Sequence, residues 1–181
     1  MRLTALVLLF FFASCGVGGG GGGGSSDSSS EIPVAAATAE DISALPNTIL
    51  IGDRVMVTAK FRSIISDGMV ARFKFPKSLE YVRDTAFLKY KDGTKVDIGP
   101  SHNKTSEDST YLVFVLTQDS LDDESRAEIS FILEGASEVE TASIGVDPDF
   151  IDSRKSLSKQ FDVSDPRFAT KIETRVEVRK E

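Results

Sequence analysis

From Thr48 to the end of the chain, apolar and polar residues alternate with a period of two, and this pattern most constrains the fold. Such alternation is typical of a β-strand that buries one face and leaves the other in water. In the segment RVMVTAKFR (54–62), the apolar face consists of Val55, Val57, Ala59 and Phe61. No segment of ten or more residues keeps a strong helical period, so the sequence predicts an all-β protein.

Similar segments recur along the chain, separated by Gly, Asp, Pro and Ser. They are MVARFKFP (69–76), TAFLKYKDGTKVDI (85–98), TYLVFVLTQ (110–118), RAEISFILEG (126–135), EVETASIGVD (138–147) and KIETRVEVRKE (171–181). Asp92-Gly93 marks the tip of a hairpin. The segment 110–118 is apolar on both faces, as expected of a central strand. Since each amphipathic strand must bury one face, we predict an antiparallel sandwich of seven to nine strands.

Two polar, turn-rich stretches interrupt this pattern. They span residues 99–109 and 147–170, and we expect both to be long loops, the second with at most a short strand near Phe161.

The first residues differ in character from the rest. A basic start, Met1-Arg2, precedes an apolar stretch from Ala5 to Ala13 and then small residues. This is the layout of a secretory signal, and the stretch is far shorter than the roughly 20 residues that a membrane-spanning helix needs. Residues 1–14 are therefore predicted to be a signal peptide.

Cys15 is the single cysteine, so no internal disulfide is expected. The residues alone leave three roles open: part of a discarded signal, a free thiol, or the lipid-bearing first residue of the mature chain. The segment Phe12-Ala13-Ser14-Cys15 resembles the lipobox of bacterial lipoproteins, in which small residues precede an obligatory cysteine, although Phe12 replaces the usual Leu. The resemblance implies several acyl chains, such as palmitate, on Cys15 and therefore a membrane partner.

This resemblance also implies a place in the bacterial cell envelope. Gly16 rather than Asp follows the cysteine. In enteric bacteria that choice implies transfer to the outer membrane.

A tract of seven consecutive glycines, Gly18 to Gly24, and a serine-rich stretch follow the cysteine. Gly loses much backbone entropy on folding and Ser is well solvated, so this tract favours disorder. We predict that residues 15–44 form a disordered tether with a mean reach of about 30 Å. Residues 45–181 are then the β-sandwich domain, of ordinary domain length.

Three segments within the domain resemble a known type of module. IGDRVMVTAKF, FKFPKSLEYV and SRAEISFILEG resemble the repeated immunoglobulin-like domains of bacterial surface proteins, and also cohesin-type modules. Phe75 stands where the surface repeats have Leu. The resemblance implies an immunoglobulin-like β-sandwich and does not specify a partner.

Catalytic and metal-binding patterns are weak. His102 is the single histidine, and although Ser101 or Asp97 could be its partners, its polar neighbours indicate an exposed loop residue. One histidine and one cysteine cannot supply the four ligands of structural zinc. Calcium is the one metal worth weighing, with Asp147, Asp149 and Asp152 as candidate ligands, but a solvated Asp-Pro-Asp turn is the favoured interpretation and no metal site is expected.

Charge and aromatic content exclude some partners. The formal net charge is −7 and the basic residues are not clustered, so nucleic-acid binding is not expected. Carbohydrate binding usually needs flat aromatic platforms, and the chain has no Trp and three Tyr.

These observations favour a lipid-anchored cell-envelope protein, not an enzyme, whose β-sandwich is a non-catalytic binding or structural module. No cofactor is expected, and another envelope protein is a candidate partner. An exposed edge strand, with no unpaired acid, aromatic platform or catalytic pocket, would favour such a partner through strand addition. The alternative is a module that binds carbohydrate or a calcium-dependent protein partner, as cohesins do.

Overall fold

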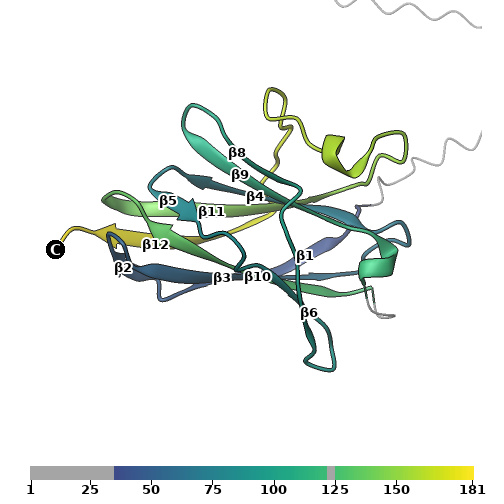
Figure 1. The fold of residues 1–181 in the computed structure, drawn as a ribbon, viewed down its shortest axis with the longest axis horizontal. Helices are drawn as coiled ribbons and strands as arrows, with labels where there is room; N and C mark the ends of the chain where they lie inside the picture. The colour runs from purple at the N-terminus through teal and green to yellow at the C-terminus, as the bar shows by residue number, and fades with distance from the viewer. Residues whose placement is uncertain (1–34, 122–124) are drawn as a thin grey trace, which may run out of the picture. The chain divides into compact units, whose positions relative to one another are not determined.

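The computed structural model describes residues 35–121 and 125–181. These residues form twelve β-strands and two short 3₁₀ turns, Gln118–Ser120 and Leu157–Lys159. The strands build two sheets in which antiparallel pairing dominates (Figure 1). The predicted class, an all-β antiparallel sandwich, is confirmed.

One sheet, called sheet A, has six strands in the order β1-β3-β10-β6-β7, with β5 also paired to β10. Their bounds are β1 Thr38–Leu45, β3 Arg54–Arg62, β5 Leu79–Tyr81, β6 Phe87–Lys89, β7 Lys95–Asp97 and β10 Ala127–Gly135.

The other sheet, called sheet B, has the order β2-β12-β11-β4-β9-β8, and β8 lies at one edge. Its strands are β2 Thr48–Leu50, β4 Met69–Pro76, β8 His102–Thr105, β9 Ser109–Leu116, β11 Val139–Asp149 and β12 Ile172–Arg179. The pairing of β2 with β12 is parallel, whereas the other pairs in this sheet are antiparallel.

The main core lies between the two sheets and follows the predicted alternation. All four apolar positions of 54–62 are buried, and their polar neighbours are half-buried or exposed. At the centre, the ring of Phe73 meets three other buried rings edge to face. These are the rings of Phe61, Phe114 and Phe131.

The hairpin formed by β6 and β7 confirms the predicted turn. Asp92 Oδ1 accepts a hydrogen bond from the Thr94 amide at 2.7 Å, and Gly93 adopts a positive φ of 87°. A positive φ at this position is the reason that Gly is needed, because other residues are strained there.

The sandwich begins earlier than predicted. Thr38–Leu45 forms β1 and pairs with β3 along its length, although all of its residues but Leu45 were predicted to lie in the tether. Ala36, Ala37 and Ala44 are buried, because their small side chains fit where the edge strand meets the core. The predicted boundary at residue 45 is therefore wrong for residues 38–44, while residues 15–34 lie outside the described part of the chain.

The strand count and one loop are also corrected. Four strands of three residues each (β2, β5, β6 and β7) raise the number above the predicted seven to nine. The segment 99–109, expected to be a loop, contains β8. In 147–170, β11 extends to Asp149, and Phe161 lies in a loop rather than in a strand.

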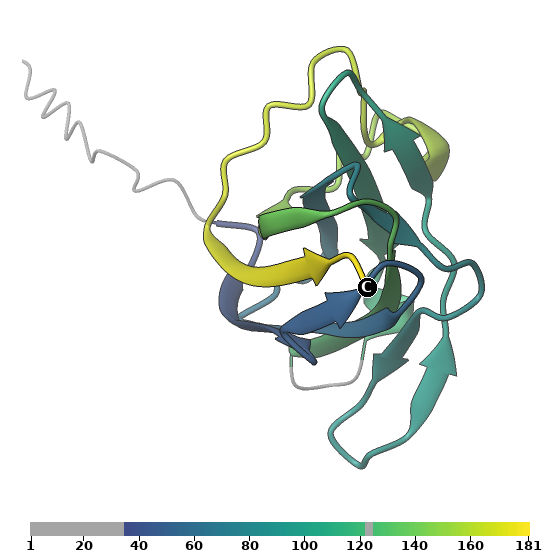
Figure 2. The ribbon, with the colours of Figure 1, turned by 90° about the vertical axis from the view of Figure 1, so that its left-hand side faces the viewer.

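A second, smaller apolar cluster covers the outer face of sheet B. The loop segment 150–171, yellow-green in Figures 1 and 2, lies outside that sheet. Phe161 packs there on Val70 of β4 and on Tyr111 and Val113 of β9. This second cluster explains why β4 and β9 are buried on both faces.

Candidate functional site

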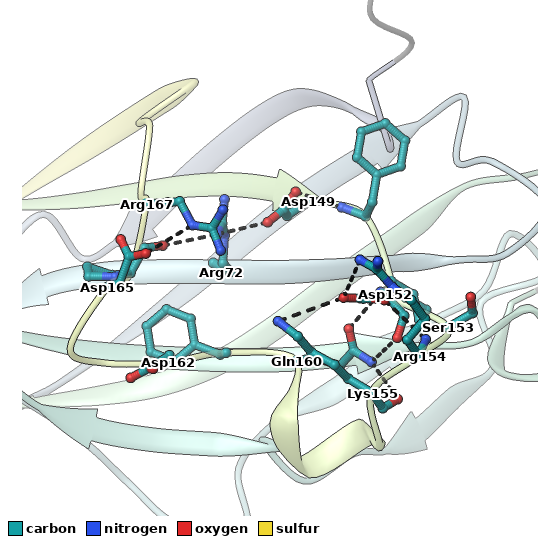
Figure 3. Close-up of a pocket in the computed structure, with 14 residues that line it drawn as sticks. Arg72, Asp149, Asp152, Ser153, Arg154, Lys155, Gln160, Asp162, Asp165 and Arg167 are labelled. Atoms are coloured by element: carbon teal, nitrogen blue, oxygen red, sulfur yellow. Dashed lines mark hydrogen bonds and ion pairs between the residues drawn. The ribbon is translucent and has the colours of Figure 1, made fainter.

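A cleft of about 620 Å³ lies where the segment 150–171 crosses the outer face of sheet B (Figure 3). It contains two of the candidate calcium ligands, Asp149 and Asp152. Half of its other lining residues are also charged: Arg72, Arg154, Lys155, Asp162, Asp165 and Arg167. The cleft therefore gathers the side chains that could hold a metal ion or transfer a proton.

Arg72 forms the base of this cleft. Its side chain is 8% exposed, because β4 turns it outward beneath the covering segment. Asp147 is its register partner on β11, and the two side chains form a buried ion pair. Nη1 also lies 2.9 Å from a carboxylate oxygen of Asp149 and donates to the carbonyl of Pro166 at 3.1 Å.

The structure does not bring the three candidate calcium ligands together as a metal site. Asp147 and Asp149 are both paired with Arg72, and the Asp147 carboxylate also accepts the amide of Ala169 at 2.9 Å. Asp152 is instead bound by Arg154. Within the described residues, no group of three or more His, Cys, Asp or Glu is placed to hold a metal. The carboxylate oxygens that calcium would need are occupied by cationic side chains and amides.

Two further acids of the cleft are held in their charged form. Hydrogen bonds from Arg154 lower the pKa of Asp152. Hydrogen bonds from the Ser164 side chain and amide lower the pKa of Asp162. A general acid needs a pKa near the working pH, so these two carboxylates are poorly suited to proton transfer. A third acid of the lining, Asp165, is paired with Arg167 at 3.3 Å.

The expectation for His102 is wrong. The residue lies in β8, half-buried, with its ring centroid 5.8 Å from that of Phe161. Its Nε2 is buried and has no hydrogen-bond partner within the described residues. Burial, with a smaller contribution from Lys104, lowers the pKa of His102. No hydrogen bond between described residues joins it to a serine or an acid, so its role here is packing.

Sequence reasoning missed Arg72 and Phe161 as key residues of this region. The available signal was the segment 110–118, apolar on both faces, which requires cover on both sides. Cys15 lies outside the described residues. Within the residues that are described, no helix is long and apolar enough to span a membrane.

No protein-family profile matches the chain, and no curated protein matches it. Among solved structures, similar folds include AvmM, which catalyses macrocyclization in alchivemycin A biosynthesis (12% identity, 80% of this chain and 89% of that chain, TM-score 0.44). Another is the cohesin module of a Clostridium perfringens family 33 glycoside hydrolase (10% identity, 82% and 100%, TM-score 0.42). A third is the T6 backbone pilin of Streptococcus pyogenes (12% identity, 79% and 35%, TM-score 0.41). At this level of similarity, none of them assigns a function to this chain.

Proposed function

We propose that this protein is a bacterial lipoprotein, anchored through lipid on Cys15, whose β-sandwich is a non-catalytic binding or structural module of the cell envelope. One observation carries the anchor: a short apolar signal ends in Ala13-Ser14-Cys15 and is followed at once by a glycine tract. The apolar signal and Cys15 serve export and lipidation, and the glycine tract separates the modified cysteine from the folded domain.

The length of the spacer fits this arrangement. Because Ala36 and Ala37 are already buried, the spacer runs from Gly16 to about residue 35. Such a chain has a mean reach of about 25 Å, enough to hold the domain clear of lipid headgroups. Two or more acyl chains are needed for firm anchoring, and the lipobox pattern implies several. Gly16 favours the outer membrane, as in enteric bacteria.

The charge pattern of the cleft supports a non-catalytic role. Its four aspartates are engaged by cations, amides or hydroxyls, and the acids with shifted pKa values are shifted downward. Acid–base catalysis usually needs at least one group whose pKa is moved toward neutrality.

Metabolic labelling with an alkyne analogue of palmitate, in the native bacterium, tests the anchor. Wild-type protein is expected to carry label and to sediment with membranes. Cys15→Ala is expected to lose the label completely, whereas Phe12→Leu, which restores the usual lipobox residue, keeps it. Label that survives in Cys15→Ala, or an unlabelled wild type, contradicts the proposal.

A further inference from the structure

A groove of about 420 Å³ opens between the two sheets, beside the edge strand β8. Sheet A contributes residues from β5 and its flanks, and sheet B contributes residues from β8 and the start of β9. The lining consists of Lys77, Leu79, Glu80, Tyr81, Arg83, Asn103, Thr105 and Thr110.

Among the described residues, no strand pairs with the outer edge of β8, so its backbone presents unpaired groups beside this groove. The Ser106 amide donates to the Ser109 carbonyl at 2.8 Å, which makes Ser106 and Ser109 a hydrogen-bonded pair, so the register makes Thr105–Thr110 a non-hydrogen-bonded pair and Lys104–Tyr111 the next hydrogen-bonded one. Hydrogen-bonded pairs alternate in an antiparallel ladder, so Asn103 and Thr105 turn their N–H and C=O groups to the free edge. Both residues are exposed. A free edge of this kind can pair with another extended chain.

The lysine of β8, Lys104, lies on the face of the sheet that points away from the groove. Lysine side chains often guard exposed edges. Lys104 shares its face of the sheet with Tyr111, which packs in the outer cluster, whereas Thr105 shares the opposite face with Thr110. The groove side of β8 therefore carries the uncharged side chains of Asn103 and Thr105.

The floor of the groove is apolar. The Tyr81 ring packs against Phe131, with centroids 6.3 Å apart. Tyr81 is half-buried, and Leu79, two residues before it in β5, is buried. The floor therefore offers an apolar surface to the central side chains of a ligand.

The charge around the groove is positive, although the whole chain carries −7. Lys77 and Arg83 flank β5 on either side in the sequence, and both are exposed. Neither forms an ion pair with another described residue. Glu80 is the acid of the lining. The two cations favour a ligand with acidic groups at its ends.

We propose that this groove binds an extended peptide segment of another protein, which adds as a strand to the free edge of β8. Its central side chains are small and apolar or hydroxylated and face Tyr81 and Thr110, and its acidic ends meet Lys77 and Arg83. This inference rests on the proposed function, because it names how the binding module would take its partner. It goes beyond that function by fixing the site and the chemical class of the ligand.

The test uses a defined probe, the fluorescein-labelled peptide Asp-Thr-Val-Thr-Val-Thr-Val-Thr-Asp, and the purified domain from residue 15 onward without lipid. Saturable binding by fluorescence anisotropy is expected. The same peptide with lysine at both ends is expected to bind about tenfold more weakly. N-methylation of alternate residues on one edge of the peptide is expected to abolish binding, and methylation on the other edge to leave it unchanged.

Variants of the protein locate the probe. Thr105→Pro and Asn103→Pro each remove an amide from the free edge and are expected to weaken binding at least about tenfold. Thr105→Val keeps the amide, so it separates the loss of the backbone donor from the loss of the side-chain hydroxyl, and its binding is expected to fall less than that of Thr105→Pro. Asp97→Pro makes the same change at the free edge of β7, a strand outside this groove, and should leave binding unchanged.

Three results overturn the proposal: no binding up to millimolar peptide, binding indifferent to both proline variants, or equal binding of the lysine-ended peptide. If instead the domain forms dimers that Thr105→Pro dissolves, the groove takes a second copy, and the proposed partner is wrong. The palmitate experiment is independent of all these outcomes. Labelled Cys15 with no peptide binding rejects the groove and leaves the anchored module intact.

Discussion

The cleft over sheet B and the groove beside β8 differ in what they leave unsatisfied. The cleft is the larger, at about 620 Å³, but its charged groups are bound to one another. The groove is about 420 Å³, yet it presents a free strand edge and two cations that form no ion pair with a described residue. Backbone groups without hydrogen-bond partners and side-chain charges without counter-ions therefore indicate a ligand site better than the volume of a cavity does. In the cleft, by contrast, the charged side chains already satisfy one another.

The cleft belongs to the stability of the fold. The segment 150–171 is attached through Arg72 and Phe161, and it shields the outer face of β4 and β9 from water. The predictions below separate this stabilising role from binding at the groove, in order of decreasing effect.

The largest effect is expected at the buried ion pair. Asp147→Asn leaves the Arg72 guanidinium with one partially exposed carboxylate, and we expect a loss of about 3 kcal/mol in the free energy of unfolding. Asp149→Asn, at a carboxylate that is 45% exposed, is the control and should cost much less. Urea denaturation measures both. A fully stable Asp147→Asn variant contradicts this role for the cleft.

Phe161→Ala removes the aromatic anchor of the covering segment. Phe161 is 9% exposed, and its loss is expected to cost about 3 kcal/mol. Leu157→Ala, in the same segment but 52% exposed, should change stability by less than about 0.5 kcal/mol. Limited proteolysis should cut Phe161→Ala within 150–171 first. Equal stability of the two variants means that the segment is not held by this contact.

Proline substitutions along β8 test the register on which the groove depends. Lys104→Pro removes an amide that donates to β9 and is expected to cost more than about 1 kcal/mol. Asn103→Pro removes an amide at the free edge and should cost about 0.5 kcal/mol or less. Thermal unfolding of the two variants decides this. The reverse order means that Asn103, and not Lys104, pairs with β9.

The smallest effect concerns pH. Because burial lowers the pKa of His102, the unfolded chain binds a proton more readily than the folded one. Stability is therefore unaffected well above pH 6.5, the ordinary imidazole value, and falls as the pH drops from there toward the lowered pKa. His102→Gln cannot be protonated and should show a shallower decline between pH 7.5 and 5. If the free energy of unfolding falls equally in the wild type and in His102→Gln, protonation of His102 does not cause the loss of stability.

Much of the sandwich could be predicted from the sequence because strands such as β3 alternate apolar and polar residues along their length. The face of β3 that contains Val57 and the hairpin tip at Asp92 were predictable for this reason. β1 was not, since Thr38–Leu45 is rich in Ala and acidic residues, and pairing with β3 overrides that composition. β8 was missed because His-Asn-Lys-Thr has no apolar residue to indicate a strand.

The candidate sites were harder to predict than the fold. Asp147 could be singled out by type, but its partner Arg72 is far away in sequence and is brought to it by the β4–β11 pairing. The groove depends on which backbone groups of β8 remain unpaired. That follows from the register of β8 on β9 and from its place at the edge of the sheet, and neither can be deduced from the sequence. Cys15 is the reverse case, since its proposed role rests on a local motif and needs no fold.

The account depends on partner recognition at the groove rather than at the cleft, and site-specific photocrosslinking in the native bacterium measures this directly. A benzophenone amino acid is placed at Thr105 in the groove or at Ser153 in the cleft, in the full-length, membrane-anchored protein. The account predicts a discrete protein adduct from residue 105 and none from residue 153. A discrete adduct from residue 153, with none from residue 105, would contradict it.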